Sequence, residues 1–174
     1  MLVGSYDTLL VLFSVLVAML ASYTALDLVG RISTTGRTAA QWWLAGGAIA
    51  MGFGVWSMHF IGMLAFSLPD VTMGFDIPLT LLSLIIACCF SLVAVWLTSR
   101  AGMQWPKLVA GAGLMGGGIA AMHYTGMAAM KMGPAIVWRP HMVLLSIVIA
   151  VTASAAGLFL AFHLRGVGHR VRYY

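Results

Sequence analysis

Five long apolar stretches dominate the chain. They cover residues 8–30, 42–66, 77–97, 108–130 and 142–164. A helix needs about 20 mostly apolar residues to cross the roughly 30 Å hydrocarbon core of a bilayer, because each residue rises about 1.5 Å. The stretches are continuous and do not alternate with period two, so helices are favoured over strands. The sequence therefore predicts an all-α, polytopic membrane helix bundle with five transmembrane helices.

The composition excludes the common classes of water-soluble protein. Of the 174 residues, 62% are hydrophobic and only 7% are charged, whereas soluble domains average about 45–50% apolar and 25% charged residues. A soluble globule, a disordered chain and a nucleic-acid-binding domain are excluded, and the lipid bilayer is the expected surrounding. The first stretch is too long for a signal peptide, and Asp7 stands where such a peptide carries basic residues, so we expect it to be a mature helix.

The basic residues predict how the helices are oriented. Seven of the nine Lys and Arg lie in the first loop, the third loop or the tail 165–174, namely Arg31, Arg37, Arg100, Lys107, Arg165, Arg170 and Arg172. The second loop has only Asp70 and Asp76 as charges. By the positive-inside rule the N-terminus is outside and the C-terminus inside. Asp27 and Arg31, four residues apart, are expected to form an ion pair at the inner end of the first helix.

One segment of the chain occurs twice. Residues 51–66 read MGFGVWSMHFIGMLAF and residues 115–130 read MGGGIAAMHYTGMAAM, at a constant offset of 64 without a gap. The repeating unit is a helix pair, with the first unit at about 8–66 and the second at about 77–130. Tandem pairs of this kind run parallel, so both segments should lie at the same depth, in the outer half of the membrane. The stretch 142–164 resembles the first helix of a third unit, and a basic tail follows it.

The repeated segment carries residues that can bind a metal. His59 and Met63 are four residues apart, as are His123 and Met127, so each pair lies on one helix face. Imidazole and thioether groups together favour copper over Mg²⁺ or Ca²⁺. Met58 and Met122 precede the histidines and point about 100° away from them, so they complete the set only with suitable helix rotation. The recurring glycines let the helix backbones approach closely.

Three other interpretations of the same residues stay open. Two histidines at one depth are also typical of a membrane cytochrome that binds haem through both imidazoles. Methionine-rich helices could instead carry copper across the membrane, and methionine is also an ordinary packing residue. The adjacent Cys88 and Cys89 are expected to be packing residues without a disulfide. The sequence contains no nucleophile–base set, paired carboxylates or phosphate loop, so a non-enzymatic role is expected.

The motif residues resemble a known family. Met122-His123-Tyr124-Thr125 matches the signature of the MHYT domain, a bacterial integral-membrane sensor, and Met58-His59-Phe60-Ile61 is similar to a divergent copy of it. The segments 56–63 and 22–26 also resemble that family. The resemblance covers essentially the whole chain, which would make residues 1–174 one MHYT-like sensor domain.

The resemblance implies a location, a ligand and a partner. Family members have seven spans with three motif copies in the bacterial cytoplasmic membrane, whereas this chain has five expected spans and two copies. They are often fused at the cytoplasmic end to domains that make or degrade cyclic-di-GMP. Their motif Met and His residues are proposed to hold copper that senses oxygen, carbon monoxide or nitric oxide. Here those residues are Met58, His59, Met63, Met122, His123 and Met127.

Overall fold

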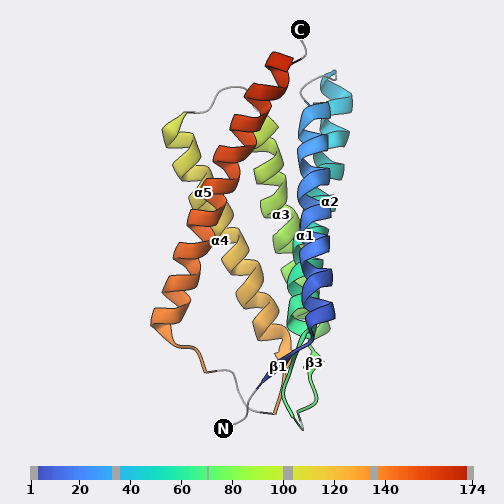
Figure 1. Ribbon diagram of the computed structural model, residues 1–174, viewed down its shortest axis with the longest axis vertical. Coiled ribbons are helices and arrows are strands. Elements are labelled where there is room, and N and C mark those ends of the chain that lie inside the picture. The colour runs from blue at the N-terminus through green and yellow to red at the C-terminus, as the bar shows by residue number, and fades with distance from the viewer. Residues whose placement is uncertain (1–3, 33–35, 70, 100–103, 134–136, 172–174) are drawn as a thin grey trace.

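The computed structural model describes residues 4–32, 36–69, 71–99, 104–133 and 137–171 (Figure 1). Five long helices run along the molecule, and each corresponds to one of the expected stretches. They are α1 (Thr8–Ile32), α2 (Arg37–Leu64), α3 (Ile77–Ser99), α4 (Trp105–Ala129) and α5 (Pro140–Val171). The predicted all-α bundle is therefore confirmed.

The bounds of all five helices differ from the expected ones by a few residues, and those of α2 and α5 differ most. Helix α2 begins at Arg37 and ends at Leu64, so it is shifted from the expected 42–66. Helix α5 continues through Val171, so most of the tail expected at 165–174 is helical. A helix end needs a breaker or a capping residue, and the polar composition of a tail alone does not supply one. Arg100, Arg172 and Asp70 lie outside the described residues.

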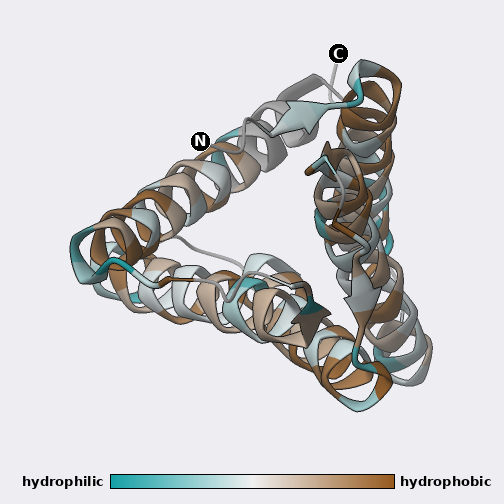
Figure 2. Ribbon diagram, turned by 90° about the horizontal axis from the view of Figure 1, so that it is seen from below, coloured by the Kyte–Doolittle hydropathy of each residue, from teal (hydrophilic) through white to brown (hydrophobic). Residues whose placement is uncertain are grey.

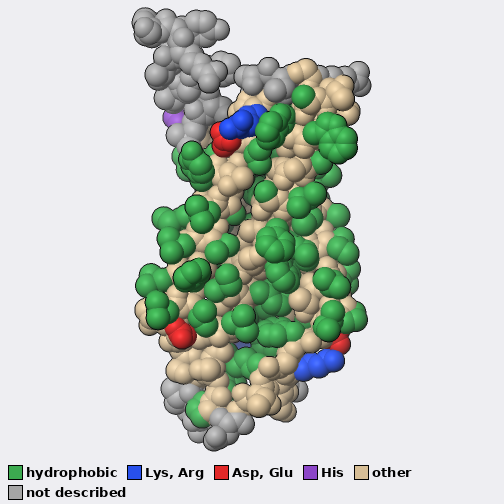
Figure 3. Space-filling model, turned by 90° about the vertical axis from the view of Figure 1, so that its right-hand side faces the viewer, with side chains coloured by type: hydrophobic (Ala, Val, Ile, Leu, Met, Phe, Trp, Pro, Cys, Tyr) green, Lys and Arg blue, Asp and Glu red, His purple; other side chains and the backbone are tan. Residues whose placement is uncertain are grey.

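Four helices within the described ranges are long and apolar enough to span a membrane, namely α1, α2, α3 and α5. Helix α4 has 25 residues and is not one of these four; its sequence includes several glycines, Lys107 and His123. Large side chains on the helices face outward, as on α1, where Leu16 is 53% and Leu20 65% exposed. Figure 3 shows hydrophobic side chains over the middle of one face, with charged side chains toward its two ends. The count of five spans and the orientation stay predictions.

Successive helices pack against each other in chain order, from α1 on α2 to α4 on α5. Seen along the long axis, they lie along three sides of a triangle (Figure 2). Helix α3 packs against both α2 and α4, the two helices that carry the repeated segment. The ion pair expected between Asp27 and Arg31 is present, with 2.8 Å from Nε to Oδ2.

Four strands of two residues each close the helix pairs at one end of the bundle. Strand β1 (Ser5–Tyr6) pairs with β2 (Phe66–Ser67), and β3 (Gly74–Phe75) pairs with β4 (Met130–Lys131), both antiparallel. These strands were not predicted, because two residues are too few to show a periodicity in the sequence. Each pairing ties the start of one helix to the end of the next.

The two strand pairs continue into equivalent hydrogen bonds. The backbone N–H of Asp7 donates to the carbonyl of Ala65 at 2.8 Å, and that of Asp76 donates to the carbonyl of Ala129 at 2.7 Å. Ala65 and Ala129 are related by the same offset of 64 as the two motifs. Both aspartates also accept hydrogen bonds from N–H groups in the first turn of the helix that follows. This capping satisfies donors that have no partner within the helix.

The first, third and fifth helices begin alike. Ser14, Ser83 and Ser146 each donate a hydrogen bond to the carbonyl three residues earlier. Each serine lies seven residues after the residue whose carbonyl accepts the first bond of the helix: Asp7, Asp76 and Arg139. The start of α5 therefore has the same local structure as the starts of α1 and α3, which each open a two-helix unit.

The pair Asp76–Lys131 links β4 to the start of α3 and should make stability depend on pH. The Lys131 ammonium lies 2.8 Å from the carboxylate, and its hydrogen bond, with that from the Leu79 N–H, holds the pKa of Asp76 below its usual value of about 3.9. A lowered folded-state pKa stabilises the fold above the unfolded pKa, and this contribution is lost as pH falls through the folded pKa.

We therefore expect Asp76→Asn to lower the thermal unfolding temperature modestly at neutral pH, with a difference from wild type that vanishes in acid. Unfolding in detergent across a pH series measures this. Asp7→Asn is the matched control, because Asp7 caps α1 similarly and its cap bonds come from the backbone N–H groups of Leu9 and Leu10. A difference that persists unchanged at low pH would exclude the ion pair as its source.

Candidate metal centre

The two motif histidines meet between α2 and α4. The rings of His59 and His123 have centroids 4.8 Å apart and planes inclined by 58°. Each ring also contacts the aromatic residue that follows it: His59 lies edge-to-face with Phe60, and His123 with Tyr124. The two imidazoles therefore lie at the equal depth that the repeat predicted, and the rotation of α2 and α4 brings them into direct contact.

Aromatic side chains surround the histidine pair in an arrangement that follows the repeat. Phe60 contacts Phe75, and its repeat equivalent Tyr124 contacts Trp138. Tyr124 is also hydrogen-bonded to Ser146. One turn before His59, the Trp56 indole N–H donates to the Ser83 hydroxyl at 3.0 Å. These contacts fix the helices that bear the histidines against α3 and α5.

One nitrogen of the pair has no protein partner. Among the residues that the structure describes, Nε2 of His59 is buried and makes no hydrogen bond. A buried polar atom without a partner costs about 1–3 kcal/mol, so its presence suggests an external ligand. Gly126 leaves the space for it, because a Cβ at that position would lie 3.0 Å from this same nitrogen.

The four methionines that the sequence predicted as metal ligands have different surroundings in the structure. Met63 is 7% exposed and Met127 half-buried, each one turn beyond its histidine. Met122 is 3% exposed and lines a small cavity against α3, with Ala87 and Ser91. Met58 lies in a groove against α1, so it is not brought to the interior cavity that its repeat equivalent lines.

The repeat explains why these two equivalent methionines have different surroundings. Met58 lines its groove with Ala18 and Ser22 of α1, just as Met122 contacts the cavity beside Ala87 and Ser91 of α3. Each therefore faces the helix that precedes its own. Helix α3 packs against both α2 and α4, whereas α1 packs mainly against α2, so only Met122 ends in the interior.

Four further residues lie on the same helix faces as the histidines and were not predicted from the sequence. Met51 and Val55 precede His59 by two turns and one turn, and Met115 and Ile119 precede His123 in the same way. All four line the small cavity beside Met122. The repeat could have identified them, because Met115 and Ile119 follow Met51 and Val55 at the offset of 64. Apolar residues are common throughout the chain, however, so their recurrence did not distinguish them as site residues.

The residues present fit a soft metal ion. The ring centroids of the two imidazoles are 4.8 Å apart, and metal–nitrogen bonds measure about 2.0–2.1 Å, so both rings can reach one ion. Met63 and Met127 carry thioethers one turn further along the same two helices. Copper accepts this donor set. Haem fits less well, because two rings whose centroids are 4.8 Å apart leave no room for a macrocycle between them. Groups of three or more His, Cys, Asp or Glu do not occur among the described residues, so further donors would be the thioethers.

The comparisons with known proteins agree with the repeat. Residues 52–111 and 116–173 both match the MHYT family, described as a bacterial signalling protein N-terminal repeat. No solved structure matches the chain.

Three curated relatives are similar along nearly the whole chain. It is 57% identical over 171 residues (98% of this chain, 25% of the relative) to the bifunctional diguanylate cyclase/cyclic di-GMP phosphodiesterase MucR of Pseudomonas aeruginosa. It is 40% identical over 163 residues (93% and 20%) to the cyclic di-GMP phosphodiesterase NbdA of that organism. It is 34% identical over 160 residues (92% and 20%) to the signaling protein YkoW of Bacillus subtilis. The chain thus spans a quarter or less of these relatives.

Proposed function

The chain belongs to the MHYT family of bacterial membrane sensory domains, and from this premise we propose that it binds copper through His59 and His123 to sense a diatomic gas. The gas would be oxygen, carbon monoxide or nitric oxide. Two relatives are named as enzymes of cyclic di-GMP turnover, so the output would be a cytoplasmic domain acting on that messenger, fused or separate. The chain itself would have no enzymatic role.

The contact between the two imidazoles carries this proposal. His59 and His123 come from equivalent positions of two repeats, and their ring centroids are 4.8 Å apart. Nε2 of His59 is buried without a partner among the described residues, and an ionisable group inside a membrane protein by default marks a functional site. Met63 and Met127 would supply thioethers from the same two helices. Copper, when bound, supplies an electrophilic centre to which a diatomic gas can bind.

The proposal predicts that copper binding needs both histidines. We expect His59→Ala combined with His123→Ala to weaken copper binding by more than the about 10–100-fold that loss of an outer-shell partner costs. Copper bound to purified protein in lipid nanodiscs, titrated against a competing chelator, measures this. His141→Ala is the matched control, because His141 is an exposed histidine at the start of α5. Equal copper affinity in the double variant and wild type would contradict the ligand role.

Further measurements separate the proposal from its alternatives. An infrared stretch from carbon monoxide added to the reduced, copper-loaded protein supports gas binding, and its absence contradicts it. A Soret band in the purified protein would support haem instead. Copper uptake into proteoliposomes would favour a transporter. A double variant that folds and signals like wild type would leave only a packing role for the histidines.

A further inference from the structure

We infer that an apolar passage inside the bundle, opening between α1 and α5, leads a diatomic molecule from the bilayer to the histidine pair. The inference rests on the proposed function and adds to it the route by which the ligand arrives. Two adjoining cavities make up the passage: a small one next to the histidines, here named the neck, and a larger one, the chamber.

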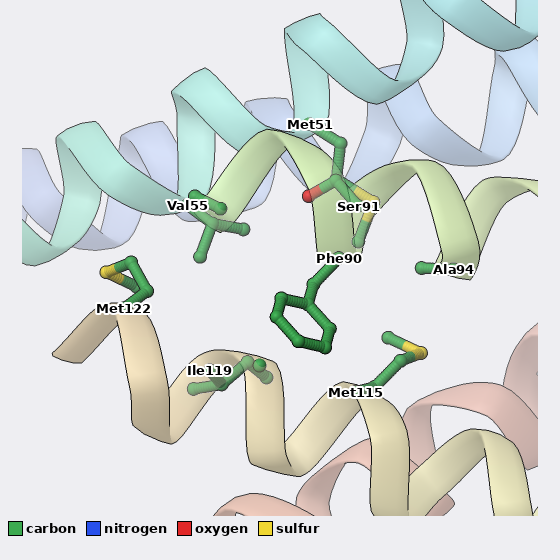
Figure 4. Close-up of a pocket in the computed structure, with 10 residues that line it drawn as sticks. Met51, Val55, Phe90, Ser91, Ala94, Met115, Ile119 and Met122 are labelled. Atoms are coloured by element: carbon green, nitrogen blue, oxygen red, sulfur yellow. The ribbon is translucent and has the colours of Figure 1, made fainter. Parts of the chain in front are cut away.

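The neck lies within one helical turn of both histidines. Its volume is about 40 Å³, and its walls include Val55 and Ile119, which precede His59 and His123 by four residues on the same helix faces. Met122, next to His123, closes one end, and the ring of Phe90 extends from α3 into the space (Figure 4). The neck therefore ends about one helical turn from the two imidazoles, with Met122 between it and His123.

The size and lining of the neck favour a small apolar molecule. A single water needs about 10–15 Å³ on this measure, so a cavity of about 40 Å³ has room for a diatomic molecule but not for a lipid chain or a drug-sized ligand. Ser91 is the one polar side chain among the lining residues. Buried water typically needs two to four polar partners, and apolar cavities of this kind stay dry and bind apolar guests such as xenon.

The chamber connects the neck to the outside of the bundle. It has a volume of about 420 Å³, all five helices contribute to its walls, and it shares Met51, Ala94, Met115 and Ile119 with the neck. Leu26 of α1 and Leu160 of α5 line it although they are 45% and 55% exposed. The chamber is therefore open between α1 and α5 at the exposed apolar side chains of Leu26 and Leu160, toward the end of the bundle where the Asp27–Arg31 pair lies.

No charged side chain is among the residues that line either cavity, and the polar groups of the lining are the hydroxyls of Ser91 in the neck and of Ser22, Thr98 and Ser154 in the chamber. An apolar passage admits gases that dissolve in hydrocarbon and excludes ions and polar solutes, whose desolvation is costly. The passage would therefore act as a filter by polarity and, at the neck, by size. Gly118 contributes to that size limit, since the Phe90 ring packs directly over its Cα hydrogen atoms.

Xenon binding to metal-free protein tests the passage independently of copper. We expect wild-type protein in nanodiscs to shift the ¹²⁹Xe resonance more than Val55→Phe or Ile119→Phe protein does, because these substitutions fill the neck and leave only the chamber for xenon. Leu114→Phe, on the exposed face of α4, is the matched control and should keep the wild-type shift. Absence of xenon binding in wild type, or displacement of xenon by lipid acyl chains, would overturn the inference whether or not copper binds.

Carbon monoxide kinetics then test whether the cavity serves as the route. In copper-loaded protein, recombination after photolysis should be slower by about tenfold or more in the two neck variants, with unchanged copper content and an unchanged rate in Leu114→Phe. Rates equal to wild type in variants with reduced xenon binding would overturn the route while leaving the copper site intact. Protein that binds xenon but no copper would instead contradict the proposed function alone.

Discussion

Replacement of Gly116 by alanine is expected to lower the free energy of unfolding by about 1–3 kcal/mol, the usual cost of overpacking. A Cβ at this position would lie 2.5 Å from Cα and 2.6 Å from N of Val151, the backbone of α5. Backbone atoms cannot move aside as a flexible side chain can, so α4 and α5 must separate. Separation loosens the packing that holds the second motif helix in place. Unfolding of the helix bundle in mixed detergent micelles, followed by circular dichroism, measures the change.

Gly117 and Gly52 provide a negative and a positive control for this prediction. A Cβ on Gly117 meets no atom within 4 Å, so Gly117→Ala should be neutral or stabilise the helix by up to about 1 kcal/mol. Gly52 is the repeat equivalent of Gly116, and its Cβ would lie 2.5 Å from Cα of Cys88, so Gly52→Ala should behave like Gly116→Ala. Equal effects at Gly116 and Gly117 would mean that close helix approach is not what this glycine provides.

The glycines of the repeat determine how each motif helix packs against its two neighbours. Gly52 and Gly116 face the helix that follows their own, whereas Gly54 and Gly118 contact Ala21 and Phe90 of the helix that precedes it. A glycine two residues from another lies about 200° around the helix, so the pattern clamps each motif helix between two neighbours. The recurrence of the glycines predicted that helix backbones approach each other closely, but it did not indicate which helix each glycine contacts.

The lengths of the apolar stretches were enough to predict the five helices, because a bilayer-crossing helix has a minimum length. The offset of 64 was enough to predict that His59 and His123 share a depth, and in the structure their rings contact each other. The offset does not determine how each helix is rotated about its axis, and so it does not determine which neighbour a side chain faces. For this reason Met58 was grouped with the histidines although it faces α1, and Met51 and Met115 were not singled out.

Substitution of Gly126 by valine is expected to weaken copper binding by about 10–100-fold, as disruption of a ligand's surroundings typically does. A Cβ at this position would lie 3.0 Å from Nε2 and 3.3 Å from Cδ2 of His59. Nε2 is the buried nitrogen without a partner, so the substitution occupies the space that an ion at this nitrogen requires. The His59 ring must rotate or retreat from His123. Copper affinity measured by chelator competition reports the loss directly.

Gly62 makes this prediction specific to the metal centre. It is the repeat equivalent of Gly126, on the other motif helix, yet a Cβ there meets nothing within 4 Å. Gly62→Val therefore introduces the same side chain at the equivalent depth without touching either imidazole, and it should retain wild-type copper affinity. If both valine variants lost copper equally, general loosening of the bundle would explain the effect. A loss confined to Gly126→Val, with matching unfolding curves for the two variants, would locate the ion at Nε2 of His59.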